Sequence, residues 1–126
     1  MMEASEMMAY KKWVVVGDVG NEMKYAGRIY KKLKNCGFDT VGMHPLNKND
    51  EYYSSFEDLK KDNVELEVLN LVVNPVRGLE VVKEAHAYGI KYVLAQPGAR
   101  SPEIKDFCSE NDMEYAEGCA LVELNN

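Results

Sequence analysis

Short apolar runs alternate along the chain with segments in which apolar residues recur every three or four positions. Runs without polar alternation are typical of strands buried on both faces of a parallel sheet. They predict five strands, over residues 13–16, 40–43, 66–73, 92–95 and 114–116. After the first run, apolar residues fall at helical spacing from Ala26 to Leu33, with lysines on the opposite face. The other connections that follow strands have similar helical patterns.

Start and stop residues delimit the helices. Residues 101–103, Ser-Pro-Glu, supply a capping hydroxyl, a preset φ and an acid at the positive end of a helix. Pro75 is placed for the first turn of a helix that ends at Gly89. Ser54, with an acid three residues later, predicts the cap of a short helix near 56–61.

The order of these elements predicts an α/β fold. Strands and helices alternate with short connections, which favours right-handed parallel crossovers. We therefore expect a single-domain, Rossmann-like, doubly wound parallel five-stranded sheet over residues 13–126, with helices on both faces, and a flexible N-terminal arm over residues 1–12. The pattern over 120–124 does not decide between helix and strand. In such sheets ligands bind beyond the carboxyl ends of the strands, beside the first strand.

Composition narrows the function. The 126 residues carry a net charge of −6, which argues against a broad nucleic-acid-binding surface. No apolar run approaches the length of a membrane span, and the first residues lack the apolar core of a signal peptide. Three cysteines without a C-x-x-C pair and two distant histidines argue against disulfides and metal sites. We expect a cytoplasmic protein without a bound metal or a membrane partner.

The loops that follow the first four strands each carry a cation. These are Lys24, Lys48, Arg77 and Arg100. An acidic protein with a cation in each loop at one edge of its sheet is suited to bind an anion there. The alternative, four solvated surface charges, stays open on the pattern alone.

The turn after the first strand reads GDVGNEMKYAG. Its glycines do not make G-x-G-x-x-G, and no acid closes the second strand to hold a dinucleotide ribose. The turn fits a mononucleotide-like ligand or no ligand. Asp18 counts against a phosphate beside its side chain, unless that side chain turns away or caps the helix. A phosphoacceptor site is excluded, because His44 and Asn74 stand where acids would be needed to hold magnesium.

Nucleophilic catalysis lacks a complete set of residues. Cys119 follows the last strand and is either a reactive thiol at the ligand edge or a buried structural cysteine. No base lies near it in sequence, so we find no catalytic constellation and do not expect an enzyme.

Several segments together resemble the small stand-alone CoA-binding-domain proteins, whose domain is similar to the N-terminal domain of the succinyl-CoA synthetase α subunit. The resemblance spans about Trp13 to Leu124. It rests on VVVGDVGNEMKYAGRIYKKLKNCGF, VGMHP, LNLVVNP and AYGIKYVLAQPGARSPEIKDFCSENDMEYAEGCALVEL. The last segment is the most specific, with Gly-Ile-Lys, a strand, Gln-Pro-Gly, a helix and a late Gly-Cys in series.

The resemblance implies CoA or acyl-CoA as a small-molecule nucleotide ligand, bound by loops at the carboxyl ends of the strands. By position, the implied residues are Gly17, Asp18 and Val19 at the diphosphate turn; Lys24 and Tyr25 at the first helix; His44 and Pro45 on the adenosine side; Val73, Asn74 and Pro75 after the third strand; and Gln96, Pro97 and Gly98 after the fourth. Three positions depart from the family's pattern: Val19 replaces a serine, Asp18 a small residue and His44 an asparagine.

Three hypotheses of function follow. The first is a non-catalytic CoA or acyl-CoA binding protein acting as a sensor or accessory module. The second is an NAD(P)-binding, redox-related domain, against which the missing glycine fingerprint weighs. The third is an interaction protein with a vestigial nucleotide site, either a homo-oligomer or bound to an unknown protein partner.

Overall fold

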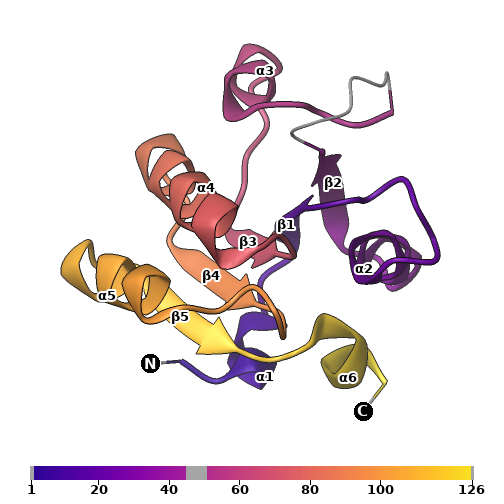
Figure 1. Ribbon diagram of the computed structural model, residues 1–126. Coiled ribbons are helices and arrows are strands. Elements are labelled where there is room, and N and C mark those ends of the chain that lie inside the picture. Colours follow the sequence, from indigo (N-terminus) through magenta and orange to yellow (C-terminus); the bar gives the residue numbers. More distant parts are fainter. Residues whose placement is uncertain (1, 45–50, 126) are drawn as a thin grey trace.

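The computed structural model describes residues 2–44 and 51–125, in which strands and helices alternate along the chain (Figure 1). The strands are β1 (Lys12–Val16), β2 (Asp39–Met43), β3 (Val68–Leu71), β4 (Tyr92–Ala95) and β5 (Glu114–Glu117). The helices are α1 (Ala4–Met7), α2 (Tyr25–Asn35), α3 (Phe56–Lys61), α4 (Pro75–Tyr88), α5 (Pro102–Glu110) and α6 (Ala120–Leu124). Across these described ranges, no helix has the length and apolar character needed to cross a bilayer.

The sheet is parallel throughout, in the order β2-β1-β3-β4-β5. This confirms the doubly wound fold that the sequence predicts. The strand β2 is added on one side of β1, and the later strands β3, β4 and β5 are added on its other side. The crevice at which the winding reverses therefore lies beyond Val16, at the carboxyl ends of β1 and β3.

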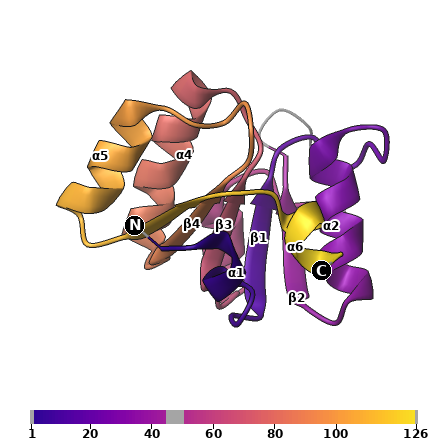
Figure 2. The ribbon, with the colours of Figure 1, turned by 90° about the horizontal axis from the view of Figure 1, so that it is seen from below.

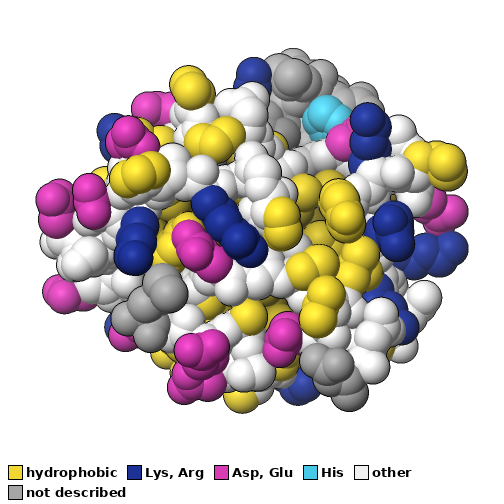
Figure 3. All heavy atoms as spheres, turned by 60° about the horizontal axis from the view of Figure 1, so that its bottom comes forward, with side chains coloured by type: hydrophobic (Ala, Val, Ile, Leu, Met, Phe, Trp, Pro, Cys, Tyr) yellow, Lys and Arg dark blue, Asp and Glu magenta, His cyan; other side chains and the backbone are white. Residues whose placement is uncertain are grey.

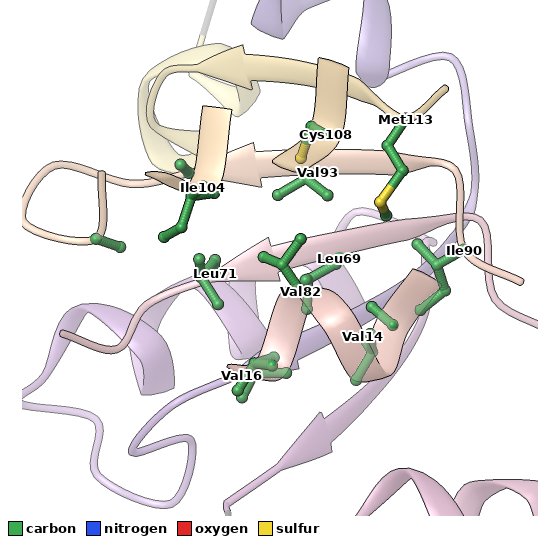
Figure 4. Packing of buried hydrophobic residues seen from close by; sticks show 14 of the residues in the cluster. Val14, Val16, Leu69, Leu71, Val82, Ile90, Val93, Ile104, Cys108 and Met113 are labelled. Atoms are coloured by element: carbon green, nitrogen blue, oxygen red, sulfur yellow. The ribbon is translucent and has the colours of Figure 1, made fainter. Parts of the chain in front are cut away.

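Helices cover both faces of the sheet, which explains the purely apolar strands (Figures 1 and 2). Helices α3, α4 and α5 lie on one face, where Val14, Val16, Leu69 and Leu71 pack against Val82 of α4 and its neighbours (Figure 4). Helices α1, α2 and α6 lie on the other face, over a second buried cluster that includes Trp13 and Val15. The space-filling view in Figure 3, with the bottom of Figure 1 turned forward, shows hydrophobic side chains gathered in a patch with charged side chains around it.

The predicted starts of two helices are confirmed. The side chain of Asn74 accepts a hydrogen bond from the backbone N–H of Arg77 at 3.0 Å, with Pro75 in the first turn of α4. The hydroxyl of Ser101 accepts a hydrogen bond from the backbone N–H of Ile104 at 3.2 Å at the start of α5.

Two local expectations need correction, and one segment left undecided by the sequence is assigned. The cap of α3 is Ser55, whose hydroxyl accepts the backbone N–H of Asp58 at 3.2 Å, so the prediction of Ser54 was wrong by one residue. Ser54 instead donates to the Asp58 carboxylate at 3.1 Å. The third strand is shorter than the apolar run predicts, and the undecided segment at 120–124 is helical.

The first residues, expected to form a flexible arm, pack against the sheet. Residues 4–7 form α1, with Met7 fully buried. A Cβ on Gly118 would stand only 2.5 Å from the Cβ of Ala4, so α1 lies directly against the loop after β5. The backbone N–H of Met2 donates to the carbonyl of Tyr115 at 3.1 Å, in the edge strand β5. Burial of Met7 removes apolar surface from water, which favours the folded position of these residues.

Candidate functional site

The chain leaves β1 through Gly17, at the crevice between β1 and β3. A Cβ on Gly17 would stand 2.7 Å from the carbonyl oxygen of Val72 and 2.9 Å from the Cβ of Ala26. The backbone therefore passes between the end of β3 and the first turn of α2, and no larger residue fits without a shift. Helix α2 begins after this turn, and the first N–H groups of a helix, which have no partner within it, favour an anion nearby.

Asn21 folds the rest of this loop against α2. Its carbonyl accepts the N–H of Lys24 at 3.0 Å, and its side chain accepts the N–H of Met23 at 2.9 Å. A Cβ on Gly27 would stand 2.1 Å from the Asn21 carbonyl oxygen, which explains the third glycine of the turn. The loop thus brings Lys24, the N-cap residue of α2, and the exposed Tyr25 to the same edge.

Asp18 forms a pair with His44, the first residue after β2. Oδ1 of Asp18 lies 3.3 Å from Nε2 of His44, with the two side chains 47% and 18% exposed. The net charge of the pair is −1 with a neutral imidazole and zero with an imidazolium. Asp18 does not cap α2, since the N-cap residue is Lys24. The carboxylate is instead paired with His44, the first residue after β2.

Val19 is buried. Only 3% of its surface is exposed, and it belongs to the apolar cluster under α2. The resemblance implies a serine at this position. Val19 supplies no hydroxyl there, and its side chain is buried. Its N–H donates to the carbonyl of Gly17 at 2.9 Å, within the same turn.

The loop after β3 borders a groove. Asn74 is exposed but its side chain is engaged in capping α4, and Val73 and Pro75 are half-buried. The groove has a volume of about 530 Å³ and runs from Met43 between the residues preceding α3 and the first turns of α4, including Arg77. Its volume lies in the range of roughly 300–1,000 Å³ typical of small-molecule sites.

The loop after β4 is anchored by a buried side chain at its start. Gln96 is 2% exposed, and its amide nitrogen donates to the side-chain oxygen of Asn70 at 2.8 Å. Pro97 and Gly98 form the exposed tip of the loop, with Gly98 at φ +89°. The Arg100 guanidinium donates to the carbonyls at Ala95 (3.0 Å) and at the start of the loop after β5 (3.4 Å). Arg100 therefore ties two loops together, a use that the sequence does not reveal.

Two of the four predicted cations remain unpaired at this edge. Lys24 and Arg77 have no ion-pair partner within residues 2–44 and 51–125. They come from the helices that follow β1 and β3, the strands that flank the crevice. Lys48 and Pro45 lie outside the described residues. The edge thus combines helix N–H groups with two available positive charges, a combination suited to phosphate.

The cysteines occupy three environments. Cys36 is exposed, Cys119 is half-buried as the N-cap residue of α6, and Cys108 is buried in the core. Burial raises the pKa of Cys108 to about 11, which keeps its thiol protonated near neutral pH. Within the described part of the chain, no three His, Cys, Asp or Glu side chains gather in a way that could hold a metal ion.

Comparison with known proteins places this edge in context. A family model described as a CoA binding domain matches residues 11–125. The chain belongs to the CoA-binding-domain family. A solved conserved hypothetical protein from Pyrococcus furiosus is 36% identical, with a TM-score of 0.78, covering 90% of this chain and 99% of its own. No curated protein sequence matches.

Two further solved structures share the fold. A hypothetical protein from Pyrococcus horikoshii OT3 has a TM-score of 0.86 at 23% identity, covering 99% of this chain and 95% of its own. A protein from Thermus thermophilus has a TM-score of 0.82 at 22% identity, covering 98% of each chain. These likenesses confirm that the α/β sheet is that of other small single-domain proteins.

Sequence reasoning missed two contributors to this CoA-binding-domain fold near its edge. Asn70 lies in the apolar run of β3 and accepts a hydrogen bond from Gln96, which follows the neighbouring strand β4. Tyr52 lies over two glycines, since a Cβ on Gly42 or Gly20 would stand 3.0 or 3.2 Å from its ring. The signals were a single polar residue in a buried strand and a pair of glycines in adjacent segments, neither of which specifies its partner.

Proposed function

We propose that this protein binds CoA or acyl-CoA without catalysing a reaction on it, as a sensor or accessory module. One observation carries the proposal within the CoA-binding-domain family. Gly17 lies so close to Val72 and Ala26 that the first turn of α2 is fixed at the β1–β3 crevice. A diphosphate at this position meets the N–H groups of a helix N-terminus with Lys24 beside it.

The remaining edge residues suit the rest of such a ligand. Arg77, across the crevice on α4, supplies a second cation for phosphate oxygens. The groove between α3 and α4 offers space for a base or ribose, on the side of His44 that the resemblance assigns to adenosine. The exposed tip at Pro97 and Gly98 then faces the flexible part of the ligand that is not nucleotide.

Two features favour this proposal over the NAD(P) alternative and over catalysis. His44, and no acid, follows β2, so the usual partner of a dinucleotide ribose is missing at that position. The half-buried thiol of Cys119 has no hydrogen-bond or ion-pair partner among the described side chains that could act as its base.

Thermal unfolding at fixed ionic strength tests the proposal with CoA, acetyl-CoA, NAD⁺ and AMP. A ligand at a hundred times its dissociation constant stabilises by about 2.7 kcal/mol, a shift of several degrees for a domain of this size. We expect CoA and acetyl-CoA to raise the Tm more than NAD⁺ and AMP. Lys24→Ala is expected to reduce the CoA shift, because it removes a charge beside the start of α2.

Lys105→Ala is the matched control, since Lys105 is an exposed lysine of α5 far along the sheet. It should leave the CoA shift intact. No shift with CoA or acetyl-CoA at millimolar concentration would contradict the proposal. Equal losses in Lys24→Ala and Lys105→Ala would contradict the placement at the turn after β1.

A further inference from the structure

A buried amide occupies the centre of the sheet. Asn70 of β3 is fully buried and stands in register with Val15 of β1 and Leu94 of β4. Its row continues to Ala116 of β5, so every other member is apolar. Burial of an amide among apolar side chains costs free energy unless its hydrogen bonds are made.

Each of the two side-chain amides, of Asn70 and Gln96, has one polar atom in a hydrogen bond and one without a partner among the described residues. Gln96 Nε2 donates to Asn70 Oδ1 at 2.8 Å, whereas Asn70 Nδ2 and Gln96 Oε1 have no hydrogen-bond partner within the described residues. Each buried polar group without a partner lowers the stability of the folded protein. An apolar pair of similar volume would avoid this cost, so the gain in stability from one hydrogen bond does not account for the pair.

The pair holds the start of the loop after β4. Gln96 also donates its backbone N–H to the carbonyl of Leu71 at 3.2 Å and accepts the N–H of Ala99 at 3.0 Å, which closes the turn. Gln96 and Ala99 are both buried, while Pro97 and Gly98 between them are exposed. The side-chain bond to Asn70 thus fixes the residue on which the exposed tip of the loop is built.

We propose that Asn70 is a positioning residue, which acts through Gln96 to hold the Pro97-Gly98 tip at the ligand edge. The ligand part of this inference rests on the proposed function, whereas the structural part does not. Asn70 lies one position before the end of β3 and does not reach the edge itself. The carboxamide of Gln96, turned inward, sets the backbone and leaves the tip to face the ligand.

The test replaces both amides together with Asn70→Leu/Gln96→Met, which removes the unpaired groups along with the bond. We expect a Tm equal to or above that of the unchanged protein. In the ligand-free protein, hydrogen exchange at the Ala99 amide is expected to become about tenfold faster, because its turn loses its anchor. CoA affinity is expected to fall about tenfold, with the shift by AMP unchanged.

The matched control is Thr40→Val, another buried polar residue in the same sheet, whose hydroxyl donates to the carbonyl of Phe38 at 3.2 Å. It should leave exchange at Ala99 and CoA affinity unchanged. If the double variant does not fold, Gln96→Ala gives the same exchange readout at the loop alone. Unchanged exchange at Ala99 overturns the inference. Faster exchange in a protein that never binds CoA overturns the proposed function and its ligand arm while supporting the positioning role.

Discussion

Asp18 and His44, two of the three positions at which this chain departs from the resemblance, are neighbours in space. The carboxylate that would repel a phosphate lies 3.3 Å from an imidazole nitrogen. Asp18 nevertheless remains about half exposed, so its charge acts on any anion bound at the start of α2. The sequence shows both residues but not their pairing, because they follow different strands.

At this scale we predict that Asp18→Asn strengthens CoA binding. Removing one negative charge near a diphosphate is worth about 1 kcal/mol in a partly solvated site, or roughly fivefold in affinity. Calorimetric titration at low ionic strength measures the effect, which added salt should reduce. Asp106→Asn, at an exposed position of α5, is the control and should change little. Weaker binding in Asp18→Asn would show that the pair with His44 supports the ligand.

At the scale of elements, α4 links stability to the site. Its cap residue Asn74 lies in the loop after β3, and its first turn carries Arg77 toward the groove. A frayed first turn would therefore displace a cation of the candidate site. The side chain of Asn74 is committed to the helix, whatever its backbone contributes to a ligand.

We predict that Asn74→Ala lowers the free energy of unfolding by about 1 kcal/mol, the usual effect of losing an N-cap. Urea denaturation followed by circular dichroism measures it. Asn74→Asp keeps an oxygen in the capping position and should retain most of the stability. A loss of the same size in both variants would mean that the cap is not the source of the effect.

The elements themselves were largely predictable from the sequence. Apolar runs gave the strands and Ser101, Pro75 and Gly89 gave helix ends, because these signals act within a few residues. The cap at Ser55 was not predictable, because the neighbouring Ser54 offers the same hydroxyl. Helix α1 was not predictable either, because burial of Met7 depends on strands far along the chain. The pair of Asn70 and Gln96 depends on tertiary contact in the same way.

At the scale of the whole molecule, burial makes stability depend on alkaline pH. Burial raises the pKa of Cys108 from 9.0 to about 11. Burial, and then a hydrogen bond to Glu117, raise the pKa of Tyr115 as well. Both groups thus keep their protons in the folded chain at a pH where the unfolded chain releases them.

We therefore predict that these two groups leave the free energy of unfolding unchanged between neutral pH and about pH 9 and lower it as the pH rises toward 11. The Cys108 share of this loss is about 2 kcal/mol. Cys108→Ala creates a small cavity and lowers stability at every pH, but its decline above pH 9 should be shallower. Cys36→Ala, at an exposed cysteine, should keep the full decline. Parallel curves for both variants would contradict the assignment to Cys108.

The position of α1 also has a consequence for the order of assembly. This first helix, outside the range 11–125 of the family domain, packs on Gly118, and Met2 just before it donates a backbone hydrogen bond to Tyr115 of β5. Residues 2–7 can therefore take their packed position only after β5 and the loop that follows it are in place. A disturbance of β5 should therefore release these residues and expose Met7, which is fully buried in the folded protein.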